Sequence, residues 1–241
     1  MFTKVLSLKK VFKKKEWYRV GTGGNEAPFR NINFIPNAHF FEKNALARKH
    51  LKALHTDSTG RVSRKELLWG MKTNHTLQFL GAQKWWKSIF KLTAHLYHAF
   101  GVPTNVNVYI TPQGRTRSLM PHNDFTCNFM FQLAGRKRWK LWVTKEHLMP
   151  TNEKFIYGRD QEEQLTEASL GEPYMDVVIG PGDILYVPRG VFHSTSTELP
   201  PLDDPMESQI PSMHMTTQVR YPNTMTLIYL MTIFTFIHVY R

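Results

Sequence analysis

The sequence predicts a mainly β protein, a double-sheet jelly roll or β-barrel flanked by helices, with an N-terminal α/β lead-in. After Pro103 the chain changes to short alternating segments separated by turn residues, which is typical of such barrels. Before that point a long segment repeats its apolar residues with helical spacing. The length of 241 residues suits one sizeable domain with its own core. We therefore expect a lead-in over residues 1–103 that packs on the barrel, a barrel over 104–222 and an apolar tail over 223–241.

The lead-in contains segments of both kinds. Strands are expected near 29–36 and 76–80, and helices over 40–54, from Ser63 onward and over 83–100. The last helix ends at Gly101-Val-Pro103. Its spacing predicts one broad, buried apolar face made of Trp86, Ile89, Phe90, Leu92, Ala94, Leu96, Tyr97 and Phe100.

Within the barrel, alternation predicts strands over 106–110, 125–133, 137–143, 184–187 and 213–219. Residues 144–174 are polar and loop-like, with a short helix near 161–169. The segment 198–212 holds four prolines and four acidic residues, and we expect an exposed loop.

The charge balance indicates an acidic partner. Lys and Arg number 31 against 19 Asp and Glu, a net charge of +12, which suits nucleic acid or a ribonucleoprotein. Residues 1–20 hold seven basic residues and one acidic residue. This run is either a solvated basic segment or a nuclear-targeting or RNA-contacting one.

A single cysteine, Cys127, excludes an intramolecular disulfide, so nucleus, nucleolus or cytoplasm is expected. An apolar h-region is missing from the N-terminus, so a secretory signal is not predicted. The tail over 224–240 is short for a membrane span and is interrupted by Thr. We expect a buried strand or helix there, with a C-terminal membrane anchor or a truncated gene end as alternatives.

The chemistry centres on Met120-Pro-His-Asn-Asp124. On a strand, His122 and Asp124 at i and i+2 point to the same face. They would form two-thirds of a 2-His-1-carboxylate iron site, although a lone His-x-Asp is weak evidence. The same spacing continues this face as a polar row suited to a hydrated interior, with Thr126, Asn128, Met130 and Gln132.

A second strong pattern runs from Val177 to His193. Gly180-Pro-Gly-Asp183 predicts a tight turn, residues 184–187 a buried strand, and Pro188-Arg-Gly190 a second turn that leads to His193.

Four motifs in this order resemble the JmjC-type ribosomal oxygenases, Fe(II)- and 2-oxoglutarate-dependent protein hydroxylases of the cupin superfamily. They are Asn-Val-Tyr-Ile-Thr-Pro at 107–112, Pro-His-x-Asp at 121–124, Gln-Leu-x-Gly-x-Lys-x-Trp at 132–139, and Gly-Asp-Ile-Leu-Tyr-Val-Pro-Arg-Gly-x-x-His at 182–193. The resemblance implies a double-stranded β-helix and spans roughly residues 76–221.

By position, the resemblance makes His122, Asp124 and His193 the iron ligands. It also implies that 2-oxoglutarate, a co-substrate used with O2, binds through Lys137, Tyr109 and Asn107, the latter two facing the same way on a neighbouring strand. Thr126 and Asn128 would either support the ligands or the cleft, or serve structural hydrogen bonding. His214 matches a position that is not a ligand.

The function implied is hydroxylation of a His or Arg side chain of a ribosomal protein, close to rRNA or another ribonucleoprotein. Alternatives are histone lysine demethylation or RNA-base hydroxylation by the same chemistry, and a catalytically inactive cupin that serves as a binding module. Three departures bear on substrate and assembly. The usual dimerisation and winged-helix regions are absent, so a homodimer is not expected. The loop over 198–212 is long. Gln218 replaces a small hydroxyl residue.

Overall fold

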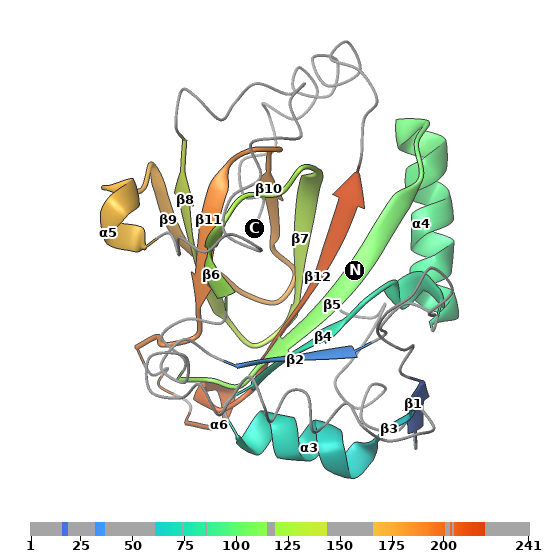
Figure 1. Ribbon diagram of the computed structural model, residues 1–241, viewed down its shortest axis with the longest axis horizontal. Helices are drawn as coiled ribbons and strands as arrows, with labels where there is room; N and C mark the ends of the chain where they lie inside the picture. The colour runs from blue at the N-terminus through green and yellow to red at the C-terminus, as the bar shows by residue number, and fades with distance from the viewer. Residues whose placement is uncertain are drawn as a thin grey trace, which may run out of the picture.

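The structure is a computed structural model that describes residues 16–18, 32–36, 61–73, 75–84, 86–114, 119–143, 166–200, 203 and 205–219. Two antiparallel sheets of six and four strands form its body, and a two-stranded ribbon lies beside them (Figure 1). The sheets face each other, because Lys137 and Trp139 of the small sheet contact Thr111 and His214 of the large one. This mainly β, jelly-roll architecture confirms the predicted fold class.

The large sheet has the strand order β10-β7-β12-β5-β4-β2. Its strands are β2 (Ile32–Pro36), β4 (His75–Phe79), β5 (Thr104–Thr111), β7 (Cys127–Ala134), β10 (Ile184–Val187) and β12 (Ser212–Val219). β2 and β4 thus extend the barrel sheet with residues from the lead-in.

The small sheet has the order β6-β11-β8-β9. Its strands are β6 (Leu119–His122), β8 (Lys137–Trp142), β9 (Met175–Ile179) and β11 (Phe192–Ser196). The ribbon pairs β1 (Glu16–Tyr18) with β3 (Arg61–Ser63). β9 was not predicted, although Met175, Val177 and Ile179 alternate with Asp176 and the exposed Val178.

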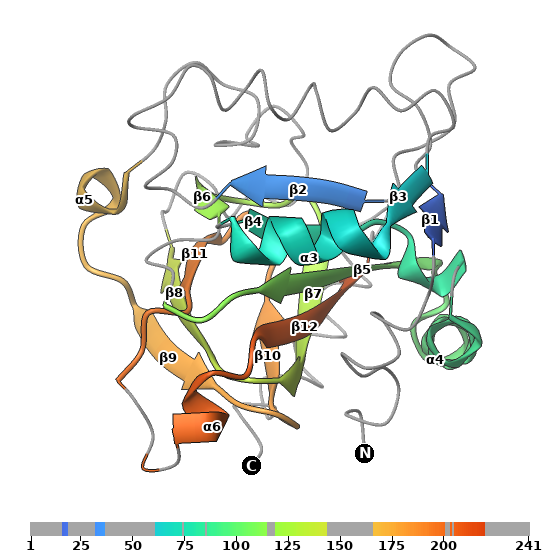
Figure 2. The same cartoon turned by 90° about the horizontal axis from the view of Figure 1, so that it is seen from below.

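The helices are α3 (Arg64–Lys72), a 3-10 turn η3 (Ala82–Lys84), α4 (Lys87–Phe100), α5 (Glu167–Leu170) and α6 (Pro205–Ser208). Figure 2 shows α3 lying across the large sheet and α4 at the side of the molecule away from α5 and β9. α6 is a short turn within the predicted exposed loop, and its Met206 is exposed.

The two faces of the large sheet differ in chemistry, as the alternation predicted. Val106, Val108 and Ile110 of β5 pack with Phe129 of β7 and Ile89 of α4 in an apolar core on the helix side. Asn107 and Tyr109 point the opposite way. The face between the sheets therefore combines apolar residues with buried polar ones, and it forms the site described below.

α4 is amphipathic, but its apolar arc is narrower than predicted. Ile89 and Thr93 are buried, whereas Phe90 is 60% and Tyr97 49% exposed. The helix begins at Lys87, because η3 and not an α-helical turn precedes it. Its end is as expected: Gly101 has φ +70° and donates its N–H to the carbonyl of Tyr97.

His122 and Asp124 do not lie on one strand, which corrects the i, i+2 argument. His122 ends β6 in the small sheet, Asp124 follows in the connection, and β7 begins at Cys127 in the large sheet. The chain crosses between the sheets at this point. The two ligands therefore meet at the connection between the sheets, and not through the alternation of side chains along one strand.

The expected helix at 40–54, most of the loop 144–174 and the tail at 224–240 lie outside the described residues. In the part that the structure describes, no helix is long and apolar enough to span a membrane.

Candidate metal and co-substrate site

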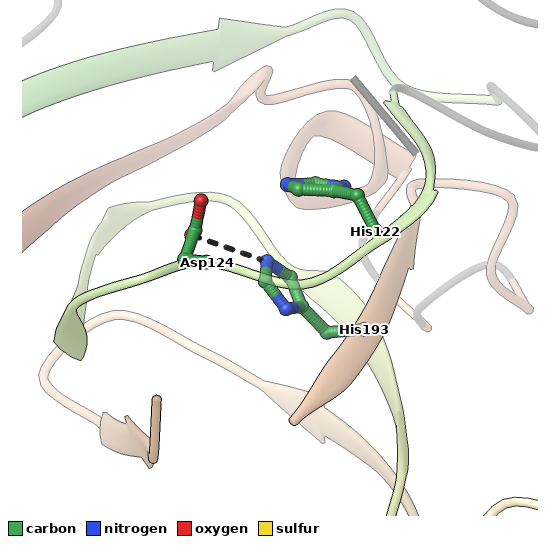
Figure 3. A group of neighbouring side chains, drawn as sticks. All are labelled: His122, Asp124 and His193. Carbon is green, nitrogen blue, oxygen red and sulfur yellow. Dashed lines mark ion pairs between the residues drawn. The ribbon is translucent and has the colours of Figure 1, made fainter. Parts of the chain in front are cut away.

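His122, Asp124 and His193 converge between the sheets (Figure 3). One ligand atom from each residue lies within 4.8 Å of the others, and all three residues are buried. The Nε2 atom of His193 is 3.7 Å from Oδ2 of Asp124, and the two imidazole centroids are 4.4 Å apart. Two imidazoles and one carboxylate in this arrangement match the donor set of a facial iron site.

Strand pairing aligns the ligands. His193 on β11 is the registered partner of His122 on β6. The turn before β11 is tied to the other ligand, because Gly190 donates its N–H to the carbonyl of Asp124 at 3.0 Å. The three residues are therefore held by backbone hydrogen bonds as well as by their side chains.

Hydrogen bonding also orients the ligand atoms. The Nδ1 atom of His193 lies 3.2 Å from the carbonyl of Val191. A carbonyl only accepts, so Nδ1 is the donor in this contact, and Nε2, on the side of Asp124, is the ring nitrogen that a metal would use. A hydrogen bond from the other ring nitrogen to a carbonyl oxygen is typical of metal-binding histidines.

Thr126 and Asn128 support the carboxylate. Asn128 Nδ2 donates to Oδ2 of Asp124 at 2.6 Å, and Thr126 Oγ1 donates to Oδ1 of Asn128 at 2.8 Å. This series of hydrogen bonds from Thr126 through Asn128 to Asp124 uses Oδ2 of the carboxylate and does not involve Oδ1. These bonds fix the carboxylate orientation that a metal requires.

Lys137 places a cation inside the protein. It is 1% exposed, and Nζ donates to Oγ1 of Thr111 at 3.2 Å, while this hydroxyl shares a hydrogen bond with Thr76. Among the described residues, no carboxylate pairs with Nζ. Burial lowers the pKa of Lys137 from 10.5 to about 7. A buried cation of this kind is costly unless an anion joins it, which makes it a fitting partner for a carboxylate ligand.

Tyr109 and Asn107 face Lys137 from the opposite sheet and not from an adjacent strand as expected, since β5 and β8 belong to different sheets. The Tyr109 hydroxyl accepts from Nε2 of Gln78 at 2.7 Å. Asn107 accepts from the Gly81 N–H and donates to Oε1 of Gln218 at 3.4 Å.

His214 belongs to the same group of buried residues between the sheets, although it was predicted only as a non-ligand. We call this group the chamber, and it consists of His122, Asp124, His193, Lys137, Tyr109, Asn107 and His214. Its ring stacks on Tyr109 at 4.8 Å and meets Trp139 edge-on at 5.3 Å. Burial first, and then the charges of Lys137 and His193, lower its pKa well below 6.5, so it is neutral near pH 7. The residue is not in the group that could hold a metal, and its place beside Tyr109 follows from the register of β12 on β5. Alternation on β12 was the signal that could have placed it in the chamber.

Gln218 joins an amide network at the edge of the chamber. Its Oε1 accepts from Asn105 at 2.9 Å as well as from Asn107, and Asn105 accepts from Gln83. The larger side chain at this position therefore ties Asn107 to neighbouring amides.

A separate cavity of about 460 Å³ lies on the other face of the small sheet, against α5. Ser194 lines it while its neighbour His193 points inward, as alternation requires. Glu167 accepts from Ser194 and pairs with Lys140 there. This cavity belongs to the outer surface and is not the metal site.

A protein-family model described as the JmjC domain matches residues 78–227. The chain belongs to the JmjC domain family. The match covers both sheets except β2 and the first three residues of β4, and it contains every residue of the chamber. It agrees with the resemblance drawn from the motifs.

Curated relatives share this region. The chain is 30% identical over 159 residues to a Dictyostelium discoideum protein named bifunctional lysine-specific demethylase and histidyl-hydroxylase NO66, covering 66% of this chain and 28% of that one. It is 33% identical over 118 residues to Ribosomal oxygenase 1 of Danio rerio, covering 49% and 20%. The chain therefore spans less than a third of the length of either relative.

Among solved structures, Escherichia coli YcfD in complex with cobalt and 2-oxoglutarate is similar, at 20% identity and a TM-score of 0.42, covering 67% of this chain and 36% of that one.

Proposed function

We propose that the chain is an Fe(II)- and 2-oxoglutarate-dependent oxygenase that hydroxylates a His or Arg side chain of a ribosomal protein. The observation that carries this proposal is that one buried chamber contains both the His122–Asp124–His193 group and the amine of Lys137, which pairs with no carboxylate among the described residues. A metal site and a carboxylate site in one chamber are what a metal-bound 2-oxo acid requires.

His122, Asp124 and His193 would hold the iron on one face and leave its other positions for 2-oxoglutarate and O2. When bound, these groups supply the oxidation of a C–H bond. The protein's own part is to position the reactants and to keep the chamber dry, and the 1–4% exposure of Lys137, Tyr109 and Trp139 serves that purpose.

Lys137 would bind the distal carboxylate of 2-oxoglutarate, with Thr111 holding Nζ in place. Burial disfavours the charged form of Nζ, and a bound carboxylate would offset this cost, so binding favours the protonated amine. Tyr109 and Asn107 line the opposite wall and would contact the co-substrate from the large sheet. Asn128 keeps the Asp124 carboxylate oriented throughout.

The names of the relatives support the substrate class. They include a histidyl-hydroxylase and a ribosomal oxygenase. A ribosomal substrate also fits the net charge of +12, because the protein would meet such a substrate beside rRNA. We place the enzyme in the nucleus, nucleolus or cytoplasm, where a single buried cysteine stays reduced.

Lysine demethylation is a second candidate, because the Dictyostelium relative carries that activity in its name. It would use the same chamber to hydroxylate an N-methyl group. The two candidates differ in product: a mass increase of one oxygen for side-chain hydroxylation, and loss of a methyl group as formaldehyde for demethylation.

The proposal is tested by incubating the protein in air with Fe(II), 2-oxoglutarate and His- and Arg-containing ribosomal-protein peptides, or with methyl-lysine histone peptides. Succinate and peptide masses are measured. We expect succinate and an oxygen added to a ribosomal peptide, and neither with Asp124→Ala. If formaldehyde formed from the histone peptides and no oxygen were added to a ribosomal peptide, the activity would be demethylation and not side-chain hydroxylation. If the folded protein formed no succinate, the enzyme proposal would be rejected, and the alternative of a cupin that acts as a binding module would stand.

A further inference from the structure

The solvent side of α4 combines aromatic and basic side chains. We call this the α4 outer face, and it consists of Lys84, Lys87, Phe90, Lys91, His95, Tyr97 and His98. All seven are exposed, with Phe90 at 60% and Tyr97 at 49%. Helical spacing puts Phe90 and Tyr97, seven residues apart, along one edge. Lys87, Lys91 and His98 form a row beside them.

Neither packing nor helix stability accounts for this face. The core contacts of α4 are made by Ile89 and partly buried neighbours on the other side. Lys87 and Lys91 make no ion pair with any described residue. Lys87 is the first residue of α4, at the end of the helix dipole that disfavours a cation, and the first turn carries no acidic residue that would offset this.

The face belongs to the basic N-terminal half of the sequence. No Asp or Glu occurs between Glu66 and Asp124. Residues 1–123 hold 21 Lys and Arg against 5 Asp and Glu, whereas residues 124–241 hold 10 against 14. The positive charge is thus segregated, and α4 lies away from the small sheet and α5 in both views (Figures 1 and 2).

We propose that the α4 outer face is a docking surface for single-stranded RNA. The lysines would neutralise phosphates, and unpaired bases would stack on the rings of Phe90 and Tyr97, which lie about 10 Å apart along the axis. An apolar protein partner fits less well. Covering the rings would also desolvate Lys87 and Lys91, and only a polyanion compensates for that cost. This role goes beyond the oxygenase function and does not require the metal site.

The test is fluorescence anisotropy of the full chain with a labelled, mixed-sequence single-stranded RNA over a series of salt concentrations. Phe90→Ala and Tyr97→Ala each weaken binding on the order of tenfold without changing the salt dependence. Lys87→Gln with Lys91→Gln lowers the slope of log K against log salt by about 1.4, the value for two lost phosphate contacts.

Matched controls lie on the other side of the molecule. Tyr174→Ala removes a ring that is 53% exposed on the side of the small sheet, and Lys140→Gln removes one charge there; both should bind RNA like the wild type. Asp124→Ala should also bind RNA normally, which separates this inference from the proposed activity. Unchanged RNA binding in all three α4 variants would overturn it. The inference would also be overturned if the wild type bound no RNA and the α4 variants instead changed self-association, measured by sedimentation.

Discussion

Lys137 is the residue at which stability and binding oppose each other. It is held between the sheets with one hydroxyl partner, and its pKa is lowered to about 7 by burial. The unfolded chain binds this proton up to about pH 10.5, so the wild type gains stability as the pH rises from about 7 to 10.5. Below pH 7 the folded protein must bury the charged amine.

Lys137→Met should therefore stabilise the ligand-free protein, by about 1–3 kcal/mol at pH 6 and by less at pH 9. The same variant should lose 2-oxoglutarate binding. Urea unfolding at the two pH values measures the effect, and the exposed Lys91→Met serves as the control with little change. A destabilised Lys137→Met at pH 6 would show that the amine is better satisfied than its single hydrogen bond indicates.

Asn128 gives a second prediction, for metal affinity. Its Nδ2 holds Oδ2 of Asp124, so Asn128→Ala should weaken binding of Mn(II), a redox-stable stand-in for Fe(II), by about 10- to 100-fold. Thr126→Val should have a smaller effect, because it acts only through Asn128. Isothermal titration measures both. Thr217→Val is the control: its buried hydroxyl lacks a partner among the described residues and faces away from the chamber. Equal affinities for wild type and Asn128→Ala would remove Asn128 from the metal's support.

At the scale of elements, the sequence predicted strands better than connections. Alternation placed β5, β7, β8 and β12 within a residue or two, because each has a more apolar and a more polar face. β10 was predicted instead as a buried apolar run between two turns. The crossing at Pro121–Asp124 was read as a continuous strand, because a switch between sheets preserves side-chain alternation locally. The exposure of Phe90 was also missed, since periodicity identifies apolar residues but not the neighbours that cover them.

The turn between β7 and β8 yields a prediction about backbone space. Gly135 has φ +57°, and a Cβ there would lie 2.6 Å from the carbonyl oxygen of Ile210 and 2.7 Å from that of Pro211. Gly135→Ala should destabilise the protein by more than about 2 kcal/mol, from backbone strain and from the clash before β12. Gly101→Ala is matched in φ, at +70°, but its Cβ would meet nothing within 4 Å, so a cost near 1 kcal/mol is expected. Chemical denaturation compares the two, and equal losses would contradict the clash.

At the scale of the molecule, the chamber joins two sheets. His122, His193 and Lys137 come from the small sheet, while Tyr109, Asn107 and His214 come from the large one. The sequence identified the residues through motif order, and the resemblance implied their roles. It did not show that Lys137 faces Tyr109 across the core, because which strands face each other is set by long-range pairing that no local pattern encodes.

A ligand that bridges the two sheets should stabilise the whole fold. Mn(II) with 2-oxoglutarate at about 100 times the Kd is expected to add about 2.7 kcal/mol and to raise the Tm. Asp124→Ala should lose this gain entirely, and Lys137→Ala should keep the part due to metal alone. Thermal unfolding with metal, with co-substrate and with both measures the contributions. A shift in Asp124→Ala equal to that of the wild type would place ligand binding elsewhere.

We propose that one chamber holds a metal and 2-oxoglutarate together. It is tested most directly by anaerobic titration of the protein with Fe(II) and 2-oxoglutarate, followed by visible absorption of the weak charge-transfer band of the chelate. We predict a saturable band in the wild type, its absence in His122→Ala, and a co-substrate requirement shifted to much higher concentration in Lys137→Ala. A folded wild-type protein that gives no band, or an unchanged band in His122→Ala, would contradict the claim.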